Sequence, residues 1–399
     1  MKVIKASFLA RPEFKADPYP FYARMRDESP VFRVSIPLPG QWWLLTRYDD
    51  IAAMLKDDRV SRDLLPKLRW LPRFLRPLLD NMLGREPPDH GRLRRLVSMA
   101  FTPRRIAEMR GQIERVCEDL SSAAPTGRPF DLVADYALPL PLTVIAELLG
   151  IPPEDRQRFH VMVRRSLPIV VPTGSLLDIP LSLPSAWLLT RYFRGLFAER
   201  RLWPRDDLIS ALVQAEEAGD RLSADELLGT AMLLVAAGYE TTVHLIASGA
   251  LALFQNPHER ARFMTDPGLA DSAIEELLRY TSPVEMSTPR IILEDVTFAS
   301  VTIPKGSLVS GVLGSANRDE SHFMEPDRLD LGRSPNKHLA FGVGHHFCLG
   351  ASLARLEARI ALTTLFHHRP ALRLAQPVES LRWRKALPLR ALAALPVTS

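Results

Sequence analysis

The chain has 399 residues, of which 46% are hydrophobic and 24% are charged, and this composition is typical of a soluble globular protein. Its net charge of +5 comes from scattered arginines without blocks of like charge, which argues against a nucleic-acid-binding protein. Two cysteines, Cys117 and Cys348, are too few for a disulfide framework and indicate a reducing cytoplasm. The apolar run before Arg11 is too short for a signal peptide.

Apolar periodicity predicts mostly helices, with a few strands near the N-terminus and late in the sequence. Strand-like segments are residues 30–35, 41–48 and 290–304. Helical segments are residues 49–57, 91–101, 102–120, 222–255, 270–280 and 349–368. Because strands are few and no linker is evident, we expect a mainly α (α+β) fold in a single domain over residues 1–399, with a β-rich N-terminal part and a helical body.

Residues 166–190 contain no Lys or Arg and a single acidic residue, Asp178. Four prolines and Gly174 interrupt this segment too often for a transmembrane helix, so no membrane anchor is expected there. Two interpretations remain open, namely a buried irregular connection between helices and an apolar lid over a ligand cavity.

The segment 222–255 is the longest predicted helix. Ser223 and Glu226 have the spacing of a capping box at its start. At about 1.5 Å per residue the helix should extend close to 50 Å and cross the molecule.

Residues 341–350, FGVGHHFCLG, place Cys348 close to two histidines and three glycines. Structural zinc needs about four ligands in closely spaced pairs, and no other Cys or paired His accompanies this segment. A nucleophilic cysteine remains possible. The glycines instead favour close approach of a large flat group, and the helix predicted from about residue 349 presents its positive end to a thiolate.

This segment resembles the haem-binding signature F-G-x-G-x-H-x-C-x-G of the cytochrome P450 superfamily. The matching residues are Phe341, Gly342, Gly344, His346, Cys348 and Gly350. The resemblance implies the triangular P450 fold, with a long central helix over haem b (iron protoporphyrin IX). It makes the Cys348 thiolate the proximal ligand of the iron and His346 a hydrogen-bond donor to a haem propionate.

Residues 237–242, AGYETT, lie in the middle of the long predicted helix. A glycine inside a helix costs about 1 kcal/mol, so Gly238 needs a helix contact or a nearby ligand. Thr241 can also bond back to the carbonyl of Ala237 and open a kink. The segment resembles the family's A-G-x-[E/D]-T motif. That resemblance implies that Ala237 and Gly238 contact the haem, and that Glu240 and Thr241 relay protons to bound dioxygen.

Glu276 and Arg279 share a helix face, where an exposed pair would contribute only a few tenths of a kcal/mol. The pair resembles the family's E-x-x-R motif, which is structural. His90 and Arg94, also on one helix face, and Arg290 are either surface charges or, by the resemblance, partners of the haem propionates.

The resemblance covers the chain from about residue 15 to its end. It implies a cytoplasmic bacterial haem-thiolate monooxygenase of secondary metabolism without a fused reductase. Dioxygen and an external ferredoxin or flavodoxin with its reductase would be required, and the basic surplus fits an acidic partner. The alternatives are a peroxide-driven peroxygenase, a non-catalytic haem-binding sensor and a cysteine hydrolase. The Glu240–Thr241 pair argues against the first, and the absence of a suitable histidine beyond His346 argues against the last.

An apolar substrate such as a lipid, terpenoid or polyketide is expected, because the segments that line the pocket in this family are apolar here. The residues proposed to contact it include Leu64, Leu65, Trp70, Leu71, Phe74, Leu234, Val284, Met286 and Leu387. Four cations in the segment 62–84 form either a solvated face or a site for a carboxylate or a carrier-protein phosphate. They are Lys67, Arg69, Arg73 and Arg76.

Overall fold

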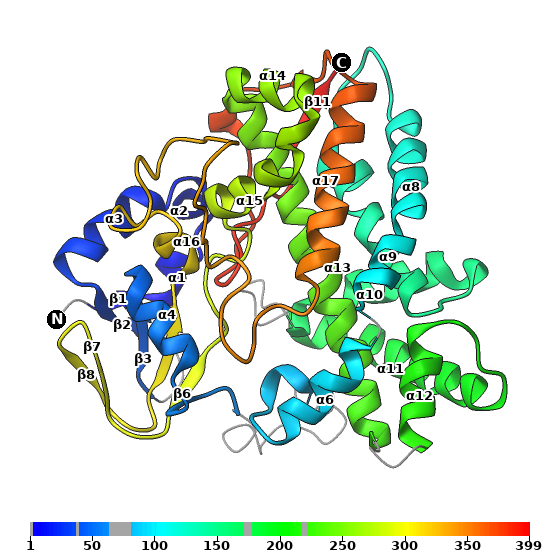
Figure 1. The fold of residues 1–399 in the computed structure, drawn as a ribbon, viewed down its shortest axis with the longest axis horizontal. Helices are drawn as coiled ribbons and strands as arrows, with labels where there is room; N and C mark the ends of the chain where they lie inside the picture. The colour runs from blue at the N-terminus through cyan, green and yellow to red at the C-terminus, as the bar shows by residue number, and fades with distance from the viewer. Residues whose placement is uncertain (1–2, 37–39, 64–80, 100, 171–177, 218–221) are drawn as a thin grey trace. The chain divides into compact units, whose positions relative to one another are not determined.

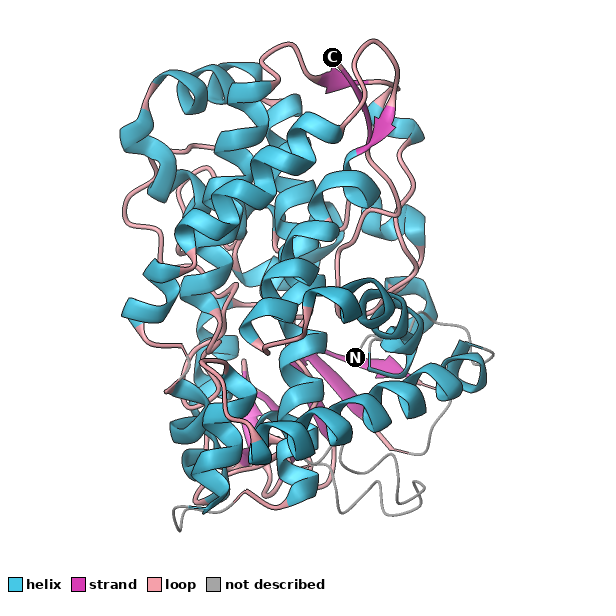
Figure 2. Cartoon of the chain, turned by 90° about the vertical axis from the view of Figure 1, so that its right-hand side faces the viewer, coloured by secondary structure: helices cyan, strands magenta, loops and turns pink. Residues whose placement is uncertain are grey.

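The computed structural model describes residues 3–36, 40–63, 81–99, 101–170, 178–217 and 222–399. Helices dominate this part of the chain and the strands form small sheets, as Figure 2 shows. The predicted mainly α fold with small β-sheets is confirmed. The four cations between residues 67 and 76, and the apolar residues between 64 and 74 that were expected to contact substrate, lie outside the described residues.

The chain divides into two compact units. The first consists of residues 1–61, 110–140 and 241–399, and the second of residues 62–109 and 141–240. Two helices, α9 (Pro139–Leu148) and α13 (Ala224–Gln255), continue from one unit into the other. The single domain expected from the sequence therefore remains a prediction.

The first unit contains a six-stranded sheet of order β1-β2-β3-β9-β6-β4. Its strands are β1 (Val3–Lys5), β2 (Val31–Ser35), β3 (Trp42–Leu45), β4 (Val60–Ser61), β6 (Arg290–Ile292) and β9 (Leu308–Gly311). β3 pairs antiparallel with β2 and parallel with β9, so distant parts of the sequence meet at its centre. Two smaller sheets comprise β5 (Phe130–Asp131), β10 (Arg373–Leu374) and β11 (Pro396–Thr398), and the hairpin β7 (Val296–Phe298) and β8 (Val301–Ile303).

The helices of the first unit cover this sheet or pack against one another. They are α1 (Ala6–Leu9), α2 (Pro12–Ala16), α3 (Tyr19–Glu28), α4 (Tyr48–Lys56), α8 (Arg110–Ala123), α14 (Pro257–Thr265), α15 (Ala270–Thr281), α16 (Leu313–Ala316) and α17 (Ala351–His368). Figure 1 shows α17 beside α8, against which it packs. Gly249 of α13 allows close packing, because a methyl group there would come within 3.3 Å of Leu277 in α15 and of Leu362 in α17.

The second unit is helical where it is described. It contains α6 (Asp89–Ser98), α7 (Pro103–Glu108), α10 (Arg156–Val170), α11 (Asp178–Leu202) and α12 (Leu208–Glu217). α10 packs along α11, and α11 packs against α12. The buried Arg200 connects α11 to the chain before α10 and before α12, because it donates to the carbonyl of Gly150 at 2.8 Å and to Asp207 at 2.7 Å.

The long helix begins as expected. The backbone N–H of Ser223 donates to Glu226 at 2.7 Å and that of Glu226 donates to Ser223 Oγ at 3.2 Å, so the predicted capping box is confirmed. Among the described residues, α13 is the one helix long and apolar enough to span a membrane. Within the structure 72% of its most apolar window is buried, as in a core helix.

Two local predictions were wrong where the structure describes the chain. Residues 166–170 and 178–190 are helical and not an irregular connection, because α10 continues to Val170 and α11 begins at Asp178, with Pro184 inside it. Residues 171–177 lie outside the described part of the chain, and the lid interpretation remains a prediction. The segment 102–120 is two helices, α7 and α8, divided near Met109. The 32 residues of α13 form one continuous helix, and the kink expected at Thr241 remains a prediction.

Candidate functional site

Cys348 lies in a glycine-rich loop that leads directly into α17. Gly342 and Gly344 have φ values of +68° and +79°, a region that favours glycine. The N–H of Cys348 donates to the carbonyl of Phe341 at 3.0 Å and closes the loop. The Cys348 thiol is half-buried, and α17 begins three residues later with its positive end toward the loop.

Open space lies beside two glycines of this loop. A Cβ at Gly342 or Gly350 would meet no atom within 4 Å, whereas one at Gly344 would come within 3.0 Å of the carbonyl oxygen of Leu55. The loop therefore presents an open surface at positions 342 and 350 and rests on α4 at position 344.

Arg290, the first residue of β6, lies next to the same loop. Its side chain is buried and its Nη1 donates to the carbonyl of Leu55 at 3.1 Å. The Leu55 oxygen is also the atom that position 344 approaches, so this cation and the cysteine loop meet at Leu55. Inside protein, a guanidinium in this place is suited to pair with a carboxylate.

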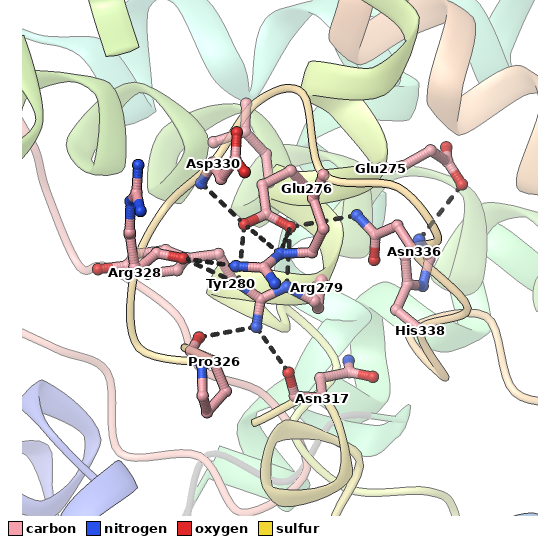
Figure 3. Close-up of polar contacts among 12 residues, drawn as sticks. Glu275, Glu276, Arg279, Tyr280, Asn317, Pro326, Arg328, Asp330, Asn336 and His338 are labelled. Carbon is pink, nitrogen blue, oxygen red and sulfur yellow. Dashed lines mark hydrogen bonds and ion pairs between the residues drawn. The ribbon is translucent and has the colours of Figure 1, made fainter. Parts of the chain in front are cut away.

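Glu276 and Arg279 of α15 form a fully buried ion pair, shown in Figure 3. Arg279 donates to both carboxylate oxygens of Glu276 at 2.8 Å. It also donates to the carbonyls of Asn317 and Pro326 at 2.8 Å and of Arg328 at 3.2 Å. One side chain thus holds two stretches of backbone, around Asn317 and over residues 326–328, that have no regular secondary structure of their own.

The Glu276 carboxylate accepts further hydrogen bonds from the segment that precedes the cysteine loop. Arg333 Nε lies 3.1 Å from the Glu276 carboxylate, Asn336 Nδ2 lies 3.1 Å from it, and the N–H of Asp330 lies 3.0 Å from it. Asn317, whose carbonyl binds Arg279, accepts from the N–H of Leu339 at 2.7 Å. These contacts fix the chain up to two residues before Phe341.

A second ionic group contacts Phe341 through Arg355. Arg355 of α17 donates to Glu275 at 2.6 and 2.8 Å, and its guanidinium carbon lies 4.6 Å from the centre of the Phe341 ring. His338 Nε2 lies 3.3 Å from the Glu275 carboxylate. Although burial opposes ionisation, His338 and Arg355 lower the pKa of Glu275 to about 2. Arg355 was not singled out from the sequence, because only the fold brings it to Phe341.

Three positions in the middle of α13 form an accessible stripe on one face of the helix. Leu233 and Thr241 are partly exposed and Ala237 is exposed, and these positions are four residues apart on one helix face. Glu240 is 3% exposed. The predicted contact residue Leu234 is buried, whereas its neighbour Leu233 is on the stripe. Four-residue spacing from Thr241 would have identified Leu233.

Gly238 has a structural explanation within the second unit. A Cβ at this position would lie 3.1 Å from Ile145 of α9, so glycine allows the two helices to pack closely. This contact favours the helix-contact interpretation over ligand approach at Gly238.

His90 and Arg94 lie one turn apart on α6, in the second unit. His90 is 3% exposed and Arg94 is partly exposed, so His90 is not an ordinary surface charge. Arg290 and His346 belong to the first unit, where His346 is half-buried.

The remaining predicted contact residues lie in two neighbouring segments of the first unit. Val284 forms an isolated antiparallel bridge with Leu389. Val284 and Leu387 are partly exposed, whereas Met286 is 2% exposed and packs in a core cluster with Phe14 and other N-terminal residues.

These residues fit a haem group. The Cys348 thiol lies just before a helix N-terminus on a loop with open space beside two of its glycines, and a buried arginine lies next to that loop. The other cysteine does not fit, because burial raises the pKa of Cys117 to about 12. Within the described ranges, no three His, Cys, Asp or Glu side chains gather as ligands of a separate metal ion.

Comparison with known proteins gives consistent matches. The sequence profile of the Cytochrome P450 family matches residues 264–369. The chain is 41% identical to the polyketide biosynthesis cytochrome P450 PksS of Bacillus subtilis, over 97% of this chain and 96% of that protein. The solved PksS structure matches with a TM-score of 0.91 over 98% of both chains.

Two further similar structures were solved as complexes. The myxobacterial cytochrome P450 CYP267B1 in complex with myristic acid is 44% identical, with a TM-score of 0.88 over 98% of both chains. P450BioI in complex with an acyl carrier protein ligated to hexadec-9Z-enoic acid is 39% identical, with a TM-score of 0.89 over 97% of this chain and 99% of that one.

Proposed function

Since this chain belongs to the cytochrome P450 family and is a haem-thiolate monooxygenase of hydrophobic small molecules, we propose that Cys348 is the iron ligand and that residues 341–350 bind the proximal face of haem b. The single observation that carries this assignment is the half-buried thiol in a glycine loop directly before α17. Bound there, the haem supplies the activation of dioxygen for insertion of oxygen into substrate.

The protein holds this thiolate in place through two supports. The Glu276–Arg279 pair fixes the chain before the loop, and Arg355 packs on Phe341 within it. The N-terminal end of α17 and the closing hydrogen bond from Cys348 to Phe341 orient the loop. We assign His346, Arg290, His90 and Arg94 to the haem propionates, because buried carboxylates need cationic partners.

Proton delivery is assigned to Glu240 and Thr241. Thr241 lies on the open stripe of α13, where its hydroxyl can exchange a proton with a ligand, and Glu240 is the adjacent buried acid. An acid and an alcohol in sequence on one helix can pass a proton inward from solvent. This pair supports a reductase-driven reaction over peroxide-driven turnover, which would need no such relay.

We propose that the substrate is a long apolar acyl or polyketide chain. The support is the apolar character of Leu233, Val284 and Leu387, together with the fatty-acid and polyketide relatives described above. A carrier protein can present such a chain, as the P450BioI complex illustrates for a relative. The cations between residues 67 and 76 are retained as candidates for its carboxylate or phosphate.

We further propose that both units act as one catalytic domain in the cytoplasm, since α13 carries Glu240 in one unit and Thr241 in the other. Electrons would come from an external ferredoxin or flavodoxin with its reductase.

The experiment is the absorption spectrum of the reduced carbon monoxide adduct. The wild-type protein and Cys117→Ser should both show the red-shifted Soret band of thiolate-ligated haem. Cys348→Ser should lose that band while its far-ultraviolet circular dichroism is unchanged. The same red-shifted band in Cys348→Ser, or its absence in haem-loaded wild-type protein, would overturn the assignment.

A further inference from the structure

A buried charged cluster outside the haem site joins the N-terminal helices to the proposed substrate pocket. It consists of Lys15 in α2, Tyr22 in α3 and Glu285 in the loop after α15, whose side chains are at most 1% exposed. Lys15 Nζ donates to Glu285 Oε2, and the Tyr22 hydroxyl donates to Glu285 Oε1. None of the motifs found in the sequence includes these residues.

The same cluster reaches the second segment of the pocket. Lys15 Nζ donates to the carbonyl of Leu387 at 2.9 Å. The backbone N–H groups of Glu285 and Met286 donate to the carbonyl of Pro388 at 2.9 and 3.2 Å. The segments that carry Val284 and Leu387 are therefore joined by backbone hydrogen bonds and tied by one ammonium group to the N-terminal part of the chain.

The cluster lies behind the residues that we assign to substrate. Val284 and Leu387 are partly exposed, whereas Glu285 and Met286 are buried. Met286 packs with Phe14 and Tyr22 in the core cluster that also includes Val312. We call the two segments that carry Val284 and Leu387 the pocket wall. The buried side of the pocket wall is held by directional polar contacts as well as by apolar packing.

A buried ion pair is a poor device for stability alone, because its desolvation offsets much of its attraction. Its geometry is nevertheless specific. An ammonium group has three donors, and here two of them bind the Glu285 carboxylate and the Leu387 carbonyl. Apolar packing alone would allow the wall to shift, whereas these contacts fix the two segments relative to each other.

We propose that Lys15, Tyr22 and Glu285 are positioning residues that set the pocket wall at Val284 and Leu387 and so select apolar ligands by size. This inference rests on the proposed function, since it requires those two residues to face the ligand. The three residues act through the wall and do not touch the ligand.

The test compares two nitrogen ligands of haem iron in the full-length haem-loaded protein. Imidazole is small, so its dissociation constant reports binding at the haem iron. Phenylimidazole carries an additional ring, so its dissociation constant also reports the position of the pocket wall. The variants are Tyr22→Phe, which keeps the ring packing on Phe14, and the double variant Lys15→Met with Glu285→Gln. Tyr136→Phe is the matched control, because Tyr136 is equally buried and donates to the carbonyl of Ala361 at 2.7 Å, outside the wall segments.

Spectral titration gives the dissociation constant of each ligand. We expect the ratio of the phenylimidazole constant to the imidazole constant to rise about tenfold in the double variant and about threefold in Tyr22→Phe. The ratio for Tyr136→Phe should stay within about twofold of wild type, although its stability falls comparably. This separates wall position from a general loss of stability.

A ratio within about twofold of wild type in Tyr22→Phe and the double variant would overturn the inference. Should the double variant fail to fold, Tyr22→Phe against Tyr136→Phe decides alone. Failure of the proposed function is seen separately, as a wild-type protein without the red-shifted carbon monoxide band.

Discussion

Replacing Arg279 by Gln should destabilise the protein far more than any exposed ion pair would. Arg279 donates five hydrogen bonds, two to Glu276 and one each to the carbonyls of Asn317, Pro326 and Arg328. Both charged side chains are 0% exposed. The substitution removes the cation and leaves two buried carbonyls and one partly buried carbonyl without this donor, while Glu276 keeps its contacts with Arg333 and Asn336.

The expected loss is about 3–5 kcal/mol, the range for breaking one side of a buried ion pair. This is a large fraction of the roughly 5–15 kcal/mol by which folded proteins are stable. The measurement is urea-induced unfolding of the haem-loaded protein followed by far-ultraviolet circular dichroism. Haem content per protein, measured at a fixed temperature, should fall with it.

The chain offers a matched control with the same i, i+3 spacing. Glu325 and Arg328 form an ion pair of 3.1 Å whose side chains are 62% and 66% exposed. Arg328→Gln should cost no more than about 0.5 kcal/mol, because exposed pairs are solvated and contribute little. A loss for Arg279→Gln within about 1 kcal/mol of the Arg328→Gln loss would refute the reasoning from burial.

The remaining predictions concern pH dependence, the cysteine loop and the proton relay. Burial raises the pKa of Glu357 from 4.5 to about 8, so the unfolded chain loses this proton first and stability falls as pH rises through that window. The free energy of unfolding of Glu357→Gln relative to wild type, measured in urea, should therefore be a few kcal/mol higher at about pH 8 than at about pH 5. A difference between the two proteins that does not change with pH would contradict this. Gly344→Ala should lose about 1–2 kcal/mol of unfolding free energy, because its φ is +79° and its methyl would meet the Leu55 carbonyl; stability equal to wild type would be inconsistent with that contact. Thr241→Ala should lower product formed per electron consumed at least about tenfold while Thr241→Ser retains it, and equal coupling in both would remove Thr241 from the relay.

Several features of this protein follow from local sequence. The capping box of Ser223 and Glu226 forms as predicted because both side chains bind backbone groups within one turn. The Cys348 loop could be recognised because glycine at 342 and 344 meets a requirement for positive φ that other residues meet poorly. Most helices were predicted because their apolar residues recur at helical spacing.

Other features were out of reach of the sequence. The irregular connection was wrong for residues 166–170 and 178–190, because prolines at the first turn of a long packed helix or inside it are tolerated when tertiary contacts support it. The stripe of α13 that carries Leu233 could be identified only once most of the residues beside it were known to be buried. The helix contact of Gly238 could be identified only once Ile145 was placed beside it.

The sequence by itself determined which chemistry is expected of this protein, because the residues that indicate it are close together in the chain. They are a thiol among glycines just before a helix, and an acid next to an alcohol within another helix. Only the tertiary structure decided how these groups are supported. Arg279 binds backbone 38 to 49 residues away, and Lys15 binds Glu285 across 270 residues. Such contacts depend on which segments the folded chain brings together, because burial and directional hydrogen bonding act between neighbours in space and not between neighbours in sequence.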